Sequence, residues 1–201
     1  MARERRQLVL YDPEVIRGLV ARLQLTHLLA RHAERPMWAL FTFLNGFITI
    51  ALLAAVAMIS GTPFVFPSLG PTAFLFFFTP RAPSASPHHT IIGHAIGIAC
   101  GYLALVVFGL QHAPPAIVTG VSAARVGAAA LSLAATGALM ILARAAHPPA
   151  GATTLIISLG IVTKPFHLVV IEIAVAILTL QAIVINRLAG IDYPYWTLRQ
   201  D

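Results

Sequence analysis

Long apolar runs dominate the chain, and short stretches rich in proline, glycine and polar residues separate them. Four runs, at 37–59, 91–110, 122–143 and 166–187, carry almost no charge. A helix needs about 20 apolar residues to cross a hydrocarbon core of roughly 30 Å. The sequence therefore predicts four long membrane-spanning helices.

Two further apolar segments are interrupted by proline and glycine. They are "GTPFVFPSLGPTAFLFFFT" at 61–79 and "RAAHPPAGATTLI" at 144–156. A shift of 81 positions lays residues 67–73 on residues 148–154 with the shared pattern P-x-x-G-x-T-[AT], and the same shift lays long runs on long runs. The order long, broken, long therefore occurs twice.

This internal repeat predicts an all-α, polytopic transmembrane helix bundle of two inverted three-helix repeats, about 37–110 and 118–190, each with a broken second helix. Three crossings per repeat turn the second copy upside down. The alternative is four spans plus two re-entrant half-helices. That alternative moves Arg81 and Arg144 to the outside and weakens the inward bias of positive charge, so six crossings are expected.

The charges also orient the chain. With both termini in the cytoplasm, most bases that border the apolar runs lie inside, and the loop 111–120, which has no full charge, lies outside. Arg125 and Lys164 are the exceptions. The prediction is a multi-pass protein of the inner (plasma) membrane with three parts: a cytoplasmic amphipathic helix region at 1–36, a transmembrane domain at 37–190 and a cytoplasmic tail at 191–201.

The first part is expected to hold a helix that lies on the membrane surface. Asp12 suits the N-cap and Pro13 the first helical position, and apolar residues recur at helical spacing as far as Leu23. No apolar core follows directly on the basic start, so a cleavable signal is not expected. A solvated helix packed on the protein's own loops is the alternative.

Composition narrows the class of function. Hydrophobic residues make up 58% of the chain and charged residues 10%, well below the roughly 25% charged residues of soluble domains. The net charge of +6 comes mainly from bases that flank the apolar part, so nucleic acid is not an expected partner. One cysteine excludes a disulfide framework. No motif indicates an enzyme or a cofactor.

The two broken segments suggest an anion site. Pro71 suits the first turn of a helix, and Gly70 and Gly151 permit close backbone approach. A half-helix that starts in mid-membrane presents free NH groups and about half a positive charge, which favours an anion, and Thr72, Thr153 and Thr154 would add hydroxyl donors. The alternative is that the prolines only kink packed helices.

Two ionisable residues are candidates for handling a proton. His147 precedes the second break and would cap it, donate to an anion or carry a proton; hydrogen bonding to a freed carbonyl is its structural alternative. Glu172 lies about two turns into the last long run, where a charge is costly, so it is expected to be functional. Pairing with Lys164 or Arg125 is its structural alternative.

Other polar or small residues have simpler expected roles. Arg125 and Arg144 flank the run at 122–143, where bases usually extend toward the membrane surface; attracting anions toward a vestibule is the alternative. Gly93, Gly97 and Gly101 form a small-residue face that lets another helix approach closely, within the chain or in a homo-oligomer. A metal-handling alternative uses the remaining histidines: His88, His89 and His94, together with His147.

Taken together, "HPPAGATTLI", "SLGPTAFLFF", "PRAPSASP" and "IIGHAIG" resemble the HPP family of integral membrane proteins, over about 37–190. The resemblance implies a membrane protein commonly described with four helices. Members in plastids and cyanobacteria are associated with nitrite transport, while most bacterial members have no assigned substrate. This chain has "SPHHT" where the family usually has a basic or amide-containing turn, so a role for that loop carries over poorly.

The sequence thus predicts a transporter or channel for a small inorganic anion, with nitrite first. The alternatives are a histidine-based metal-handling protein and a membrane scaffold that transports nothing. The predicted substrate-binding residues are Gly70, Pro71, Thr72, His147, Pro148, Pro149, Gly151, Thr153 and Thr154, and the predicted proton carriers are Glu172 and His147. No metal or cofactor is expected.

Overall fold

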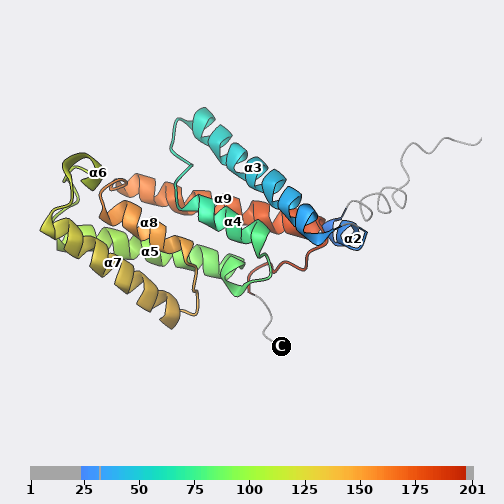
Figure 1. Ribbon diagram of the computed structural model, residues 1–201. Helices are drawn as coiled ribbons and strands as arrows, with labels where there is room; N and C mark the ends of the chain where they lie inside the picture. Colours follow the sequence, from blue (N-terminus) through green and yellow to red (C-terminus); the bar gives the residue numbers. More distant parts are fainter. Residues whose placement is uncertain (1–23, 32, 198–201) are drawn as a thin grey trace, which may run out of the picture.

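The computed structural model describes residues 24–31 and 33–197, and all regular structure in this part of the chain is helical. The elements are α2 (Leu25–Leu29), α3 (Glu34–Ser60), α4 (Leu69–Phe78), the 3₁₀ turn η1 (Pro83–Ala85), α5 (Pro87–Val107), α6 (Ala116–Thr119), α7 (Ala123–Leu142), α8 (Pro149–Ser158) and α9 (Pro165–Leu188) (Figure 1). The surface helix expected from Asp12 lies, as far as residue 23, outside the described residues.

Four helices are long and apolar enough to cross a membrane. They are α3, α5, α7 and α9, with mean hydropathies of 2.1, 2.0, 1.7 and 2.7. The predicted all-α bundle with four long spans is therefore confirmed. Proline begins two of them, Pro87 in α5 and Pro165 in α9, because a first turn leaves its NH groups unpaired and proline has none.

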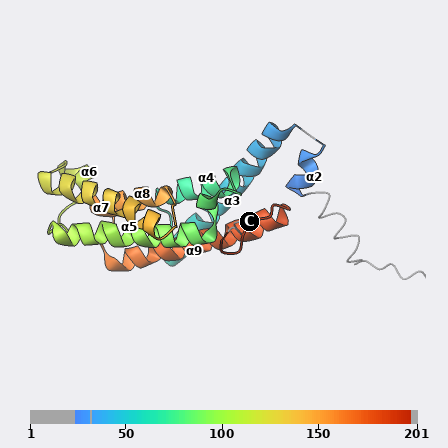
Figure 2. The ribbon, with the colours of Figure 1, turned by 90° about the horizontal axis from the view of Figure 1, so that it is seen from below.

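Helices α4 and α8 have ten residues each, about 15 Å, which is half the thickness of a hydrocarbon core. A segment without regular helix precedes each of them, residues 61–68 before α4 and residues 143–148 before α8. Figure 2 shows the two short helices on the same side of the pair α5 and α9, one toward each end of the bundle.

Contacts with the long helices place the starts of α4 and α8 near the middle of the bundle. Thr42, early in α3, donates to Phe77 O at 3.0 Å, near the end of α4. Arg125, the third residue of α7, donates to Ser158 O at 3.1 Å, at the end of α8. Each short helix thus ends beside the start of the long helix that precedes it, and begins about 15 Å deeper.

The small-residue face of α5 packs against α8 and the segment before it. A Cβ on Gly97 would lie 2.7 Å from Ala150 O, and one on Gly93 would lie 2.7 Å from His147 Cβ. A Cβ on Gly101 would also come within 2.9 Å of α8. This face is therefore filled within the chain and is not free to join two copies, so a homo-oligomer would need another surface.

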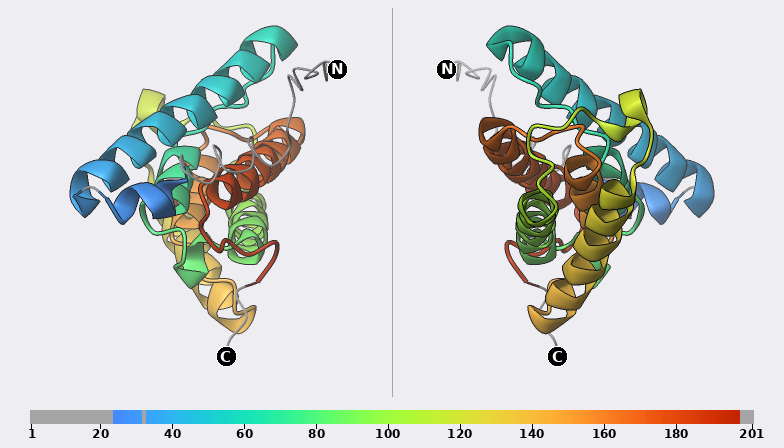
Figure 3. Two further views of the ribbon diagram at one scale, coloured as in Figure 1. Left: turned by 90° about the vertical axis from the view of Figure 1, so that its right-hand side faces the viewer. Right: turned by 90° about the vertical axis from the view of Figure 1, so that its left-hand side faces the viewer.

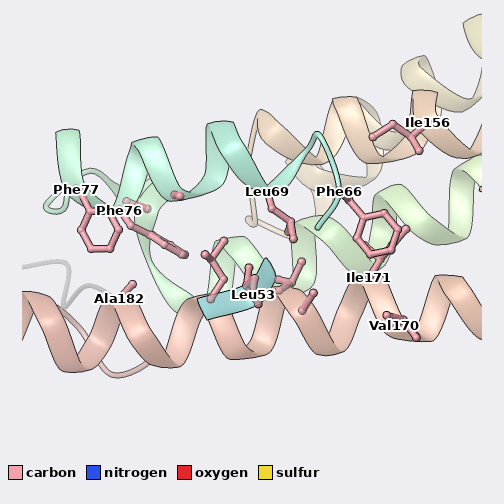
Figure 4. Packing of buried hydrophobic residues seen from close by; sticks show 14 of the residues in the cluster. Leu53, Phe66, Leu69, Phe76, Phe77, Ile156, Val170, Ile171 and Ala182 are labelled. Atoms are coloured by element: carbon pink, nitrogen blue, oxygen red, sulfur yellow. The ribbon is translucent and has the colours of Figure 1, made fainter. Parts of the chain in front are cut away.

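The apolar core lies between the short helices and α9. Figure 4 shows Phe76 and Phe77 of α4 toward the end of α9 that carries Ala182, and Ile156 of α8 on the other side of Leu69. Helix α3 contributes only Thr49 and Leu53 as buried residues, and Figure 3 shows it inclined to the other long helices. The remaining apolar surface of α3 is what a lipid-facing helix presents, because lipid tails are as apolar as its side chains.

Candidate functional site

Four buried polar side chains meet where α4 and α8 begin. Thr72 belongs to α4, His94 to α5, His147 to the segment before α8, and Thr153 to α8. All four are 0% exposed. They come from four separate parts of the chain, and we refer to them as the His–Thr cluster.

Short contacts connect all members of the cluster. Thr72 Oγ1 lies 2.9 Å from His94 Nε2 and 3.2 Å from His147 Nε2. His94 Nδ1 lies 2.8 Å from Thr153 Oγ1. At the other end, His147 Nδ1 lies 2.7 Å from Ser84 O in turn η1. The contacts therefore form one continuous chain from α8 to η1.

The Ser84 carbonyl fixes the direction of these hydrogen bonds. A carbonyl only accepts, so His147 Nδ1 carries a hydrogen and donates to it. In a neutral ring His147 Nε2 then accepts, and it is paired when the Thr72 hydroxyl donates to it rather than to Ser68 O, which lies 3.1 Å from the same hydroxyl. Because a hydroxyl has one hydrogen, His94 Nε2 donates to Thr72 and the Thr153 hydroxyl donates to His94 Nδ1. With both rings neutral, each of the four contacts has one donor and one acceptor, and donation runs from Thr153 through His94, Thr72 and His147 to the Ser84 carbonyl.

Turn η1 is itself held by the segment that follows α9. Tyr193 is fully buried and donates its hydroxyl to Ala85 O, and the His88 NH donates to Trp196 O at 2.9 Å. Burial raises the pKa of the Tyr193 phenol, so the phenol remains a donor at physiological pH. The C-terminal segment thereby positions the turn whose Ser84 carbonyl orients His147.

Three of the predicted site residues, Thr72, His147 and Thr153, belong to the cluster. Thr154 is also buried, and its hydroxyl has no hydrogen-bond partner among the described residues. The other predicted site residues divide by exposure: Pro149 is buried, Gly151 is half-buried, and Gly70, Pro71 and Pro148 are exposed. The structure therefore brings together three of the four polar members of the predicted set.

No other part of the described chain crowds Gly70 or Gly151. A Cβ on Gly70 would meet nothing within 4 Å, and one on Gly151 would make an ordinary 3.4 Å contact with Leu133 Cδ1. Neither glycine has a positive φ. The close approach between helices occurs instead on α5, at Gly93 and Gly97.

His94 is the functional candidate that sequence reasoning missed, since it was considered only as a metal ligand. Its signal is a titratable side chain inside a long apolar helix, three residues before Gly97 on a closely packed face. Such a side chain needs polar partners from other helices. Its partners, Thr72 and Thr153, are 22 and 59 positions away and are not recognisable from local pattern.

Glu172 lies in α9, outside the cluster. Both of its carboxyl oxygens are buried and have no hydrogen-bond partner among the described residues. The ion pair found among these residues joins Arg187 to Asp192 instead. Pairing of Glu172 with Lys164 or Arg125 is therefore not seen. Arg125 was expected to extend toward the membrane surface, but this expectation is wrong, because the side chain is buried and donates to backbone carbonyls.

The histidines do not assemble into a metal centre in the part of the chain that the structure describes, where no group of three or more His, Cys, Asp or Glu could hold a metal ion. The rings of His94 and His147 have centroids 5.0 Å apart. His88 instead packs against Trp196, and His89 Nδ1 lies 2.7 Å from Ser86 Oγ. The geometry thus gives the metal-handling alternative no support.

A family model described as "HPP, transmembrane region" matches residues 31–194, which include every long helix and the whole His–Thr cluster. The chain belongs to the HPP transmembrane family. The predicted resemblance is thereby confirmed.

Two curated relatives of this HPP protein are transmembrane proteins of Dictyostelium discoideum. One is 28% identical over 161 residues, which cover 78% of this chain and 49% of the relative. The other is 28% identical over 166 residues, which cover 78% of this chain and 55% of the relative. The chain thus spans about half the length of these relatives. No solved structure matches it.

The three residues of the His-Pro-Pro signature lie in two places, His147 in the cluster and the two prolines at the start of α8. His147 belongs to the cluster, and neither Pro148 nor Pro149 has an NH group. The next two amides are also engaged, because Ala150 NH donates to His147 O at 3.0 Å and Gly151 NH to Pro148 O at 2.9 Å. The expectation of free amides at this helix start is therefore wrong, and the donors at this point are side chains.

Proposed function

We propose that this HPP protein moves a small inorganic anion across the inner membrane, with nitrite as the first anion to test. Its family and its four long apolar helices are consistent with a membrane transporter or channel. One observation carries the proposal: a fully buried His–Thr cluster lies where two short helices begin in the middle of the bundle.

The cluster suits an anion because it is polar and contains no acid, and because its hydroxyl and imidazole donors, engaged with one another here, would turn to an anion once the cluster opens. Aligned peptide dipoles place about half a positive charge at the start of a helix, and α4 and α8 both start here. Broken helices that meet near the bilayer midplane are a common ion site in transporters. The hydroxyls of Ser68 and Thr154, buried and without partners among the described residues, supply further donors.

His147 accepts a proton without leaving a contact of the cluster unpaired. Once protonated, its Nε2 donates to Thr72 Oγ1, and the Thr72 hydroxyl turns to the Ser68 carbonyl, 3.1 Å away. The Ser84 carbonyl continues to accept from Nδ1. The added positive charge then faces the anion, so one proton and one monovalent anion cross as a neutral pair. Glu172 is the proposed second carrier, because an unpaired carboxyl inside a span is costly when ionised.

The burial of the cluster favours a carrier over an open pore. None of its four side chains has exposed surface, so an anion reaches them only when the starts of α4 and α8 open toward one side. Opening toward one side at a time would give alternating access around a fixed site.

We further propose six crossings in two inverted repeats, with both termini cytoplasmic. The end of α4 beside the start of α3, and the end of α8 beside the start of α7, support this path. In a Cys100→Ala background, a cysteine at His112 should react with an impermeant reagent added to intact cells, and one at Arg81 should not. External labelling at Arg81 would contradict six crossings.

Reconstitution into liposomes tests the function. Flux of nitrite, nitrate, formate, chloride and bicarbonate is measured with and without a pH gradient. We expect at least one of these anions to be transported faster with an inward proton gradient, and His147→Gln to abolish that acceleration. Absence of flux for every anion would refute the proposal and favour the scaffold alternative, whereas metal retained by purified protein would favour the metal-handling one.

A further inference from the structure

Arg125 is a buried cation without an acidic partner among the described residues. Its side chain is 3% exposed, and the guanidinium donates to Ser158 O at 3.1 Å, Ala113 O at 3.1 Å and Pro114 O at 2.9 Å. These carbonyls satisfy donors but do not cancel the charge. A charge buried in protein without a counter-ion is costly to keep, so Arg125 is a candidate for a functional role.

A cavity of about 440 Å³ adjoins this guanidinium, at the end of the bundle where α8 ends and α9 begins. Its polar lining comes from the end of α5, the loop after it and the segment before α9: Tyr102, Gln111, His112, Thr163 and Lys164. Among residues 24–31 and 33–197, no acidic side chain lines it. The lining therefore offers several hydrogen-bond donors beside a net positive charge.

Gly160 forms a thin wall between the cavity and Arg125. It lines the cavity, has a φ of +83°, and a Cβ at this position would lie 2.5 Å from Arg125 Nη2. A larger residue would therefore displace the guanidinium. The backbone of Ala113, which accepts from Arg125, lines the same cavity.

Helix α9 adds to the positive potential. Thr163, the N-cap Lys164 and Pro165 at the first position all line the cavity, so the positive end of the α9 dipole faces it. Three independent sources, a buried guanidinium, an ammonium and a helix start, thus act on one small polar space. In a membrane protein the low-dielectric surroundings strengthen their combined field.

We propose that this cavity is a vestibule that binds and concentrates small monovalent inorganic anions at the entrance to the transport path. Lys164 and the charge of Arg125 attract the anion, and hydroxyl and amide donors of the lining hold it. The role as an entrance rests on the proposed transport function, whereas the binding itself does not.

Iodide quenching tests binding without any transport. A fluorophore is attached to Ile161→Cys, on the exposed residue next to Gly160, in a Cys100→Ala background. A matched control carries it on Ser60→Cys, at the exposed end of α3, which the proposed six crossings put on the same side of the membrane. Quenching by iodide is divided by quenching by neutral acrylamide, so that differences in exposure cancel.

We expect the iodide ratio at residue 161 to exceed that at residue 60 by about threefold at low salt, as one nearby unit charge would produce. Lys164→Gln, on an exposed side chain outside the His–Thr cluster, should reduce this excess and leave the part that Arg125 and the start of α9 produce. Gly160→Ala should reduce it by displacing Arg125. Equal ratios at the two positions, or an excess that neither Lys164→Gln nor Gly160→Ala reduces, would overturn the proposal.

Flux measurements separate the vestibule from the transport function. Lys164→Gln should raise the KM for external anion about threefold and leave kcat unchanged, since the His–Thr cluster is intact. If wild type shows no flux but iodide is enriched at residue 161, the transport proposal fails and the binding proposal stands. If wild type transports and neither KM nor iodide quenching responds to Lys164→Gln, the vestibule alone is refuted.

Discussion

Replacing Thr72 by valine is the most direct test of the His–Thr cluster, because valine keeps the shape of threonine and removes only its hydroxyl. The hydroxyl is the one group that joins both rings, at 2.9 Å from His94 Nε2 and 3.2 Å from His147 Nε2. In the variant both of these ring nitrogens face a methyl group. A change of tautomer does not help, since each ring still has one unpaired nitrogen.

The expected cost follows from these two nitrogens. An orphaned buried polar group costs about 1–3 kcal/mol. Hydrogen bonds between helices in membranes average only about 0.6 kcal/mol, because the unfolded chain in the membrane also finds partners. Two orphaned nitrogens, discounted in this way, give an expected loss of about 2–4 kcal/mol in the free energy of unfolding.

Thr136→Val is the matched control. Thr136 is also fully buried in a long helix, but its hydroxyl donates only to Ser132 O, 2.7 Å away in the same helix. That carbonyl keeps its helical amide partner, so this variant should lose less than about 1 kcal/mol.

Unfolding in mixed micelles with increasing dodecyl sulfate, followed by tryptophan fluorescence, measures both variants against wild type. Liposome flux is measured on the same preparations, and Thr72→Val should lose transport while Thr136→Val keeps it. If the two variants lose the same stability and retain the same flux, the cluster is ordinary helix packing and the argument for a polar site fails.

Three further variants test separate features. Gly97→Ala should lower the free energy of unfolding by about 1–3 kcal/mol, because its Cβ would lie 2.7 Å from a carbonyl oxygen of α8. Gly137→Ala is the control, since its Cβ meets open space and the change should be neutral or stabilising. Equal effects of the two variants in the micelle assay would contradict the packing of α5 on α8. Glu172→Gln should fold normally, since its carboxyl has no partner among the described residues, and should alter the pH dependence of flux; an unchanged pH profile removes Glu172 as a proton carrier. Burial raises the pKa of Tyr193 above its unfolded value of 10.0, so its neutral form stabilises the fold fully below about pH 10, and this contribution is lost as the pH rises further. Unfolding curves recorded at several pH values should show that Tyr193→Phe lacks this loss of stability. If the free energy of unfolding of wild type and variant depends on pH in the same way above about pH 10, the argument is refuted.

Local sequence determined the membrane-spanning part of the fold. Apolar runs of 20 or more residues admit few structures other than spanning helices, because the backbone has no other way to satisfy its polar groups in lipid. The proline and glycine breaks before α4 and α8 were equally readable, since proline cannot continue a helix beyond its first turn. For the same reason Thr72, Thr153 and His147, all close to the breaks, were found from the sequence.

Tertiary structure decided which residues those breaks bring together. His94 joins Thr72 and Thr153 only because glycines on α5 let α8 approach closely, and this depends on the relative position of helices that are distant in sequence. The same packing fills the glycine face of α5 from within the chain. The burial of Arg125 was also hidden, because its carbonyl partners lie 11 to 33 positions away. Hydropathy along the sequence indicates which segments are stable in lipid. Contacts between segments depend on complementary shapes and hydrogen-bonding groups, which the linear pattern does not contain.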